Sequence, residues 1–202
     1  MKLIFATGNA AKLREIRQIF DVPGVEILSM KEAGIDVDVE ENGFTFEDNA
    51  MIKAKAIHAL MPEALVMADD SGLEVDALGK FPGVFSARWY DGHDGSYDVK
   101  NAQLIRLLTD FSGEERSARF VCAIAAVLPE GEELVIRSTM EGQIAHEIKG
   151  ENGFGYDPIF YLPQYGKTSA EISPEEKNAI SHRGKALRMI KEEIIKHENI
   201  SC

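Results

Sequence analysis

The stretch Leu65-Val66-Met67-Ala68-Asp69-Asp70-Ser71-Gly72 decides how the fold is interpreted. Its first four residues are an apolar run with the length and composition of a buried strand. Two acids and a Ser-Gly pair follow at once, so we expect the strand to end at Asp69. Ligands bind at the carboxyl ends of strands in open α/β sheets, so this segment predicts a site as well as a strand.

Strands and helices alternate on the N-terminal side of this run. Leu3 to Ala6 is a second short apolar run that ends in a polar turn, and apolar residues at spacings of three and four predict a helix after it. Residues 35–48 carry six acids and no base, which predicts an anionic loop. Thr45 with Asp48 resembles a helix-opening box, and Lys53 falls beside the apolar face of the helix that follows.

The C-terminal side continues the alternation. Residues 98–111 predict a helix, and the apolar run from Phe120 to Leu128 predicts a hairpin with Leu134 to Ser138. Ser173, followed by proline and two glutamates, is a strong helix start, and a last helix follows residue 184. Interleaved strands and helices with a central hairpin predict an α/β fold with a mixed sheet.

Composition limits the function classes. The chain has 202 residues, of which 45% are hydrophobic, and we expect one domain over residues 1–202. Its formal net charge of −12 disfavours nucleic-acid and acidic-membrane partners. The two cysteines, Cys122 and Cys202, form no CxxC pair, and the first apolar run is too short for a signal peptide. These features predict a cytoplasmic protein.

The turn after the first strand is a candidate phosphate cradle. Backbone amides at a helix N-terminus attract anions, glycine allows close approach, and a lysine one turn into the helix adds a full charge. An ordinary strand-to-helix turn with a surface lysine is the alternative. The segment consists of Thr7, Gly8, Asn9, Ala10, Ala11 and Lys12.

Four carboxylates are candidates for metal binding or acid–base chemistry: Glu40 and Glu41 in the acidic loop, and Asp69 and Asp70 after the strand. Adjacent strand residues point to opposite sides, so one aspartate could ligate a metal while the other orients a partner. Hard oxygen ligands suit Mg²⁺ carrying a polyphosphate. The alternative for the two glutamates is a solvated face.

Two further segments favour recognition of a planar or anionic ligand. Phe154 to Asp157 places aromatic side chains among glycines, which suits stacking on a base or, alternatively, plugging the core. Lys177, His182 and Arg183 gather donors in an acidic protein, and a basic helix end paired with nearby glutamates is the alternative.

With these segments quoted, the chain resembles the inosine/xanthosine triphosphate pyrophosphatase family. The resemblance covers nearly the whole length through FATGNAAKLREI, EENGFTFEDNAMIKAKA, ADDSGLEVDALGKFPGVFSARW, GFGYDPIF and EEKNAISHRGKAL, in family order. It implies an elongated two-lobed α/β fold with a central mixed sheet and the active site between the lobes, usually as a homodimer. It also implies Mg²⁺-dependent hydrolysis of ITP, dITP and XTP to the nucleoside monophosphate and pyrophosphate.

Matching positions imply the site residues. Glu40 and Asp70 would hold Mg²⁺, Asp70 would also accept a proton from the attacking water, and Asp69 and Lys53 would support the phosphate site. The substrate would contact Thr7, Gly8, Asn9, Ala10, Ala11, Lys12, Ser71, Phe154, Gly155, Tyr156, Asp157, Lys177, His182 and Arg183.

Discrimination among purines has a plausible chemical origin. A 6-oxo group accepts a hydrogen bond where the 6-amino group of adenine donates, so donors such as His182 and Arg183 would favour hypoxanthine and xanthine. Three alternatives compete: an aspartyl-phosphate phosphatase, a pyrophosphatase of modified pyrimidine or standard nucleotides, and a nucleotide-binding regulator without turnover. Adjacent acids in place of DxD disfavour the first, and Ser181-His182-Arg183 favours the purine reading over the second.

Overall fold

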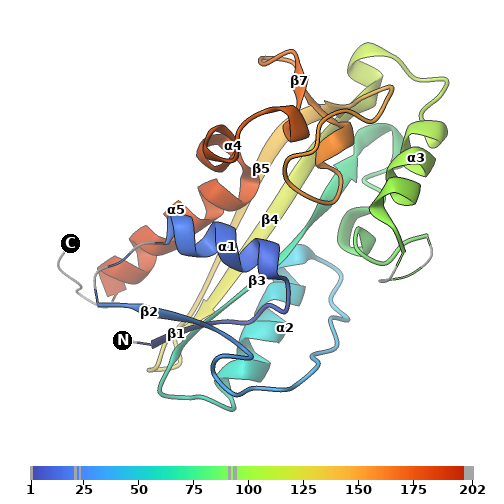
Figure 1. Ribbon diagram of the computed structural model, residues 1–202. Helices are drawn as coiled ribbons and strands as arrows, with labels where there is room; N and C mark the ends of the chain where they lie inside the picture. Colours follow the sequence, from blue (N-terminus) through green and yellow to red (C-terminus); the bar gives the residue numbers. More distant parts are fainter. Residues whose placement is uncertain (1, 21, 23, 91, 93–94, 198–202) are drawn as a thin grey trace. The chain divides into compact units, whose positions relative to one another are not determined.

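The strand that contains the two aspartates is longer than the sequence indicates. In the computed structural model, which describes residues 2–20, 22, 24–90, 92 and 95–197, β3 runs from Leu65 to Val75 (Figure 1). The expectation that it ends at Asp69 is therefore wrong. Both carboxylates have partners from other elements, so the chain keeps its extended pairing through them. Cys202 lies outside the described residues.

The described residues form one seven-stranded sheet in the order β2-β1-β3-β4-β5-β6-β7. β1 is parallel to β2 and β3, whereas β6 is antiparallel to β5 and β7, which confirms the predicted mixed sheet. The strands besides β3 are β1 (Lys2–Phe5), β2 (Glu26–Ser29), β4 (Ser117–Val127), β5 (Glu133–Ile144), β6 (Phe160–Leu162) and β7 (Lys167–Thr168).

Local capping signals set the starts of the helices. The Thr45 side chain accepts from the amide of Asp48, and Ser173 with Glu176 forms a capping box, so both predicted helix starts are confirmed. The α-helices are α1 (Ala10–Ile19), α2 (Phe46–His58), α3 (Tyr97–Leu107), α4 (Pro174–Ile180) and α5 (His182–His197). Short 3₁₀ turns cover Asp76–Leu78, Gly83–Phe85, Gly113–Arg116, Asp157–Ile159 and Ser169–Glu171.

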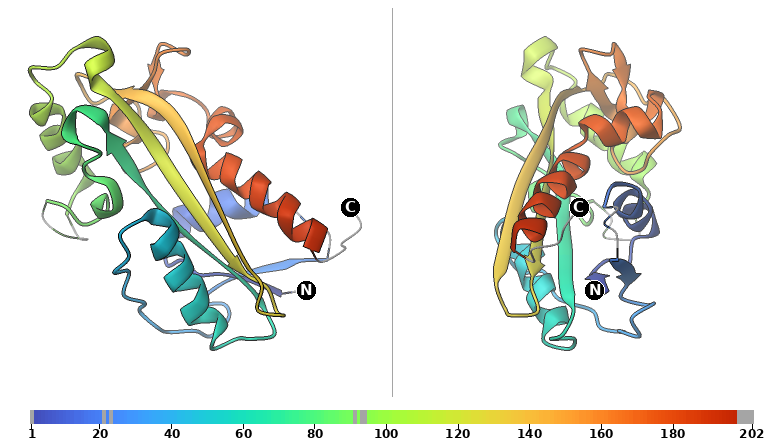
Figure 2. Two further views of the ribbon diagram at one scale, coloured as in Figure 1. Left: turned by 180° about the vertical axis from the view of Figure 1, so that it is seen from behind. Right: turned by 90° about the vertical axis from the view of Figure 1, so that its left-hand side faces the viewer.

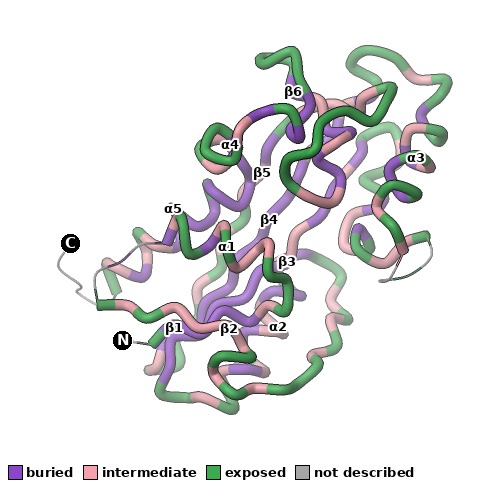
Figure 3. Tube along the Cα trace, viewed as in Figure 1, coloured by how far each residue is buried: buried purple, intermediate pink, exposed green. Residues whose placement is uncertain are grey.

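The chain divides into two compact units. Unit 1 comprises the described residues of Met1–Asp70, Cys122–Ser138 and Arg183–Cys202. In its core, α1 and α5 cover one face of the sheet through residues such as Ile16 and Leu187, and α2 covers the other (Figure 2). Of the strands in this unit, β1, β3 and β4 are buried almost throughout (Figure 3).

Unit 2 comprises Ser71–Val121 and Thr139–His182, again for the described residues. Its core joins the inward side chains of β3, β4 and β5 with α3, and includes Leu104, Phe120, Tyr156 and Phe160. No helix in the described ranges is both long enough and apolar enough to cross a membrane.

Candidate active site

The turn into α1 presents backbone amides to solvent. Asn9 caps the helix, its side chain accepting from the amides of Ala11 at 2.9 Å and Lys12 at 3.2 Å, and Thr7 Oγ1 accepts from the amide of Asn9. Gly8 and Ala10 are exposed, and within the described chain their amides have no partner. An anion could therefore reach these two amides without displacing a bond of the protein.

Asp69 is the centre of an ion-pair cluster in unit 1. Its carboxylate is fully buried and contacts Lys12 Nζ at 3.0 and 3.1 Å and Arg183 Nε at 3.4 Å. Burial alone would raise the pKa of Asp69, but Lys12, Arg183 and Lys53 outweigh it and hold the pKa well below the ordinary value. Asp69 therefore stays ionised and orients the cations around it.

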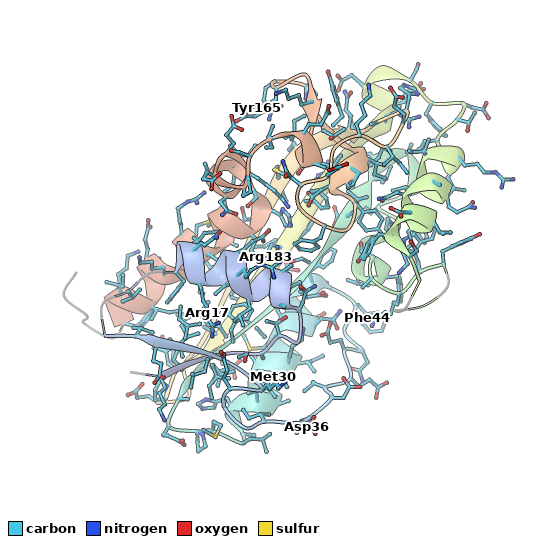
Figure 4. The ribbon with its side chains drawn as sticks, in the orientation of Figure 1. Arg17, Met30, Asp36, Phe44, Tyr165 and Arg183 are labelled. Carbon is cyan, nitrogen blue, oxygen red and sulfur yellow. The ribbon has the colours of Figure 1, made fainter. Side chains whose placement is uncertain are left out.

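Arg183 is held on its other side by α1. Its Nη1 lies 2.5 Å from Glu15 Oε2, and Figure 4 shows the residue where α5 begins, beside α1. Lys12 and Glu15 are three residues apart on α1, so both belong to one face of that helix. Lys12, Asp69, Arg183 and Glu15 thus alternate in charge and tie α1, β3 and α5 together.

Asp70 is in an opposite electrostatic environment. The side-chain amide of Asn49 donates to its Oδ2 at 3.0 Å. Burial, with a smaller contribution from the nearby carboxylate of Glu41, raises the pKa of Asp70 to about 6, although the Asn49 hydrogen bond and the charges of Lys12 and Lys53 lower it. Folding thus lowers the pKa of Asp69 and raises that of Asp70.

Lys53 connects the acidic loop to β3. Its Nζ lies 2.5 Å from Glu41 Oε1 and donates to the backbone oxygen of Asp69 at 3.1 Å. Burial alone would lower the pKa of Lys53, but Asp69 and Glu41 raise it overall. In the described chain the Glu40 carboxylate has no hydrogen bond or ion pair. The loop therefore carries one carboxylate that is engaged and one that is available.

These groups fit a magnesium ion that is bound chiefly by its substrate. Among the described residues, no three His, Cys, Asp or Glu side chains form a metal-binding group. Mg²⁺, however, is usually held by one or two carboxylates together with waters and phosphate oxygens. The predicted pair consists of Asp70, whose carboxyl is mostly buried, and Glu40, whose carboxylate has no hydrogen bond or ion pair among the described residues.

Unit 2 contains the predicted base-binding segment. Asp157 is buried, and its carboxylate accepts from Lys177 Nζ at 2.6 Å, from Ser169 Oγ at 2.7 Å and from the amide of Phe154 at 2.8 Å. Lys177 Nζ also lies 5.2 Å from the centre of the Phe154 ring. A Cβ on Gly153 would lie 2.1 Å from Asp157 Oδ2, so only glycine allows this loop to close. The predicted residues Phe154, Asp157 and Lys177 are thus brought together.

Two other predicted residues of unit 2 pack into its interior. Tyr156 is only 4% exposed, and its hydroxyl donates to Ser86 O and accepts from Trp89 Nε1, so its side chain plugs the core. His182 is buried and stacks on Phe120 with ring centres 4.9 Å apart. Gly155 accepts from the Asn101 side chain, and Ser71 follows Asp70 within β3.

Sequence reasoning missed four supporting residues: Glu15, Asn49, Asn101 and Ser169. Two of them had a usable signal, because Glu15 lies three residues after Lys12 and Asn49 four residues before Lys53 on the same helix faces. The other two come from segments that carry no motif.

Comparison with known proteins identifies the family of this chain. The sequence matches the Ham1 family over residues 3–193. The chain belongs to the Ham1 family. It is 46% identical to a dITP/XTP pyrophosphatase of Clostridium perfringens over 96% of this chain and 97% of the relative. A dITP/XTP pyrophosphatase of Geobacillus kaustophilus is 49% identical over 95% and 93%, respectively.

Solved structures give the same result. The Ham1 protein of Staphylococcus aureus superposes with a TM-score of 0.87 at 40% identity, covering 98% of this chain and 100% of that one. The HAM1 protein of Coxiella burnetii gives a TM-score of 0.87 at 37% identity, covering 97% and 99%. The predicted α/β fold is therefore that of Ham1 proteins.

Proposed function

We propose that this chain hydrolyses dITP, XTP and ITP to the nucleoside monophosphate and pyrophosphate. The observation that carries the proposal is the grouping of Lys12, Lys53, Asp69 and Asp70 in unit 1 of a chain that matches dITP/XTP pyrophosphatases over nearly its whole length. The names of the Clostridium and Geobacillus relatives support the choice of substrates.

We assign the phosphate end of the substrate to unit 1. The amides of Gly8 and Ala10 and the ammonium of Lys12 would bind the triphosphate, with Lys53 stabilising charge as pyrophosphate leaves. Glu40 and Asp70 would hold Mg²⁺, which supplies Lewis-acid polarisation of the phosphoryl group when bound. We choose Glu40 over Glu41 because Lys53 already engages the latter.

Asp70 would take the proton of the attacking water. The Asp70 carboxylate accepts from the Asn49 amide at 3.0 Å, so its oxygens have a fixed orientation toward a water placed against them. Asn49 orients the carboxylate and Asp69 keeps Lys12 in place, so the groups are arranged before the substrate arrives.

We assign the base end to Phe154, Lys177, His182 and Arg183. The Phe154 ring offers a stacking face, and the hydrogen bond from the Phe154 amide to Asp157 fixes the loop that carries it. Asp157 holds Lys177 and Glu15 holds Arg183, and each cation is a charge-assisted donor of the kind that a 6-oxo group accepts from.

The test is a steady-state panel of dITP, ITP, XTP, GTP, ATP and dUTP with Mg²⁺, with pyrophosphate release as the readout. We expect kcat/KM to be highest for the first three nucleotides and to be lost on removal of the cation. A preference for dUTP, or binding without release of pyrophosphate, would contradict the proposal. We further propose that the protein is a homodimer, which light scattering on the purified protein would test. We also propose that it is cytoplasmic, which fractionation of cells would test.

A further inference from the structure

A single buried amide joins the acidic loop to the strand that carries Asp70. Asn49, on the first turns of α2, is 0% exposed. Its Oδ1 accepts from the backbone amide of Gly43 at 2.8 Å, and its Nδ2 donates to Asp70 Oδ2 at 3.0 Å. Because both ends of the amide are bonded, the side chain has one orientation.

The acidic loop closes directly onto this side chain. A Cβ added to Gly43 would lie 2.8 Å from Asn49 Oδ1 and 2.6 Å from Asp48 Cβ, which is closer than real Cβ atoms approach. Gly43 follows Glu40 by three residues. The contact between the Gly43 backbone and the Asn49 side chain therefore fixes the position of the loop.

Lys53 makes the parallel connection one helical turn further on. It bonds the loop through Glu41 and the strand through the backbone oxygen of Asp69. Helix α2 thus holds both the loop and β3 at two points each. The connection through Asn49 ends on the carboxylate of Asp70.

We propose that Asn49 is a positioning residue for the cation site, fixing the carboxylate of Asp70 and, through Gly43, the loop that carries Glu40. The inference rests on the proposed function. At this position one short side chain has to accept from the amide of Gly43 and donate to the carboxylate of Asp70. Asparagine supplies both, whereas aspartate has no donor and adds negative charge beside Asp70.

The experiment measures metal affinity apart from turnover. Mn²⁺ is titrated into the metal-free protein, and binding is followed by loss of the electron paramagnetic resonance signal of the free ion. Loss of an outer partner of a metal ligand weakens binding by roughly 10- to 100-fold. We expect this rise in Kd for the neutral variants Asn49→Ala and Asn49→Leu.

Thr45→Ala is the matched control. It removes the N-cap of the same helix but no contact to Asp70, so its thermal stability should fall while its Mn²⁺ affinity stays at the parent value. Gly43→Ala gives a second route, because it presses on the Asn49 amide from the loop side. Circular dichroism of each variant checks the fold.

The outcomes separate the two proposals. Weaker Mn²⁺ binding by the Asn49 or Gly43 variants, with Thr45→Ala unchanged, supports the positioning role. Parent-like Mn²⁺ affinity in folded Asn49 variants overturns it even if the parent hydrolyses dITP. Equal weakening in Thr45→Ala also overturns it, since general loosening of α2 would then explain the loss. A parent that releases no pyrophosphate from dITP refutes the proposed function itself.

Discussion

Replacing Asp70 with asparagine should stabilise the metal-free protein while it abolishes turnover. The substitution removes one negative charge and keeps an oxygen that can accept from the Asn49 amide. Burial is the main reason that the pKa of Asp70 rises from 3.8 to about 6. Ionisation of this group therefore destabilises the folded chain, and asparagine, which does not ionise, removes that cost.

The size and sign of the change in the free energy of unfolding follow from the pKa of Asp70. A carboxyl whose pKa is raised by folding contributes its stability fully below pH 3.8, and that contribution is lost as the pH rises through 6. At about 1.4 kcal/mol per pH unit, the ionised group costs about 3 kcal/mol above pH 6. The asparagine variant should thus be more stable by up to about 3 kcal/mol at pH 8, or about 6 to 12 °C in Tm. Near pH 4 the difference should vanish.

Thermal unfolding in EDTA at pH 4 and pH 8 measures this difference. Asp76→Asn is the control of opposite sign, because Lys80 and Arg119 lower the pKa of Asp76 and its removal should not stabilise the protein at pH 8. Added Mg²⁺ should raise the Tm of the parent but not of the Asp70 variant. An equal Tm difference at both pH values, or a less stable asparagine variant at pH 8, would refute the reasoning.

Three further predictions concern the substrate and the cation. Glu40→Gln should raise the Mg²⁺ concentration needed for half-maximal activity more than Glu41→Gln does, and equal titrations would show that we chose the wrong glutamate. Lys12→Ala should lower kcat/KM for ITP and ATP by the same factor, because the phosphate contact is common to both; a selective loss would contradict it. Arg183→Ala should lower the ITP/ATP ratio of kcat/KM by about 10- to 150-fold, the effect of roughly 1.5 to 3 kcal/mol from a charge-assisted hydrogen bond. An unchanged ratio would remove Arg183 from base recognition.

Local signals in the sequence predict local structure well. The helix starts at Thr45 and Ser173 follow from side chains that bond amides three residues away, so a short window contains all the partners. The end of β3 did not follow from such a window. Two acids after an apolar run look like a strand end, but Lys12 and Asn49 come from distant segments and satisfy these charges inside the sheet.

The same distinction explains which candidate residues could be named from the sequence. Charged residues with a motif, such as Asp70 and Lys12, could be named before the structure was known. Ser169 could not, because it comes from a segment without a motif and hydrogen-bonds to a carboxylate 12 residues away. Asn49 was missed although its spacing from Lys53 on the same helix face was a usable signal. Tyr156 shows the converse, since an aromatic side chain in a glycine-rich loop proved to be a core residue.

Continuation of β3 through both aspartates has a chemical consequence. Neighbours on a strand point to opposite sides, so Asp69 and Asp70 meet different surroundings although one peptide bond joins them. One is neutralised by Lys12 and Arg183, and the other faces burial and the charge of Glu41. Their pKa values are pushed apart, which is how a pair of carboxylates acquires two separate roles. A strand ending at Asp69, as the sequence suggested, would free the chain to turn and would not impose this division.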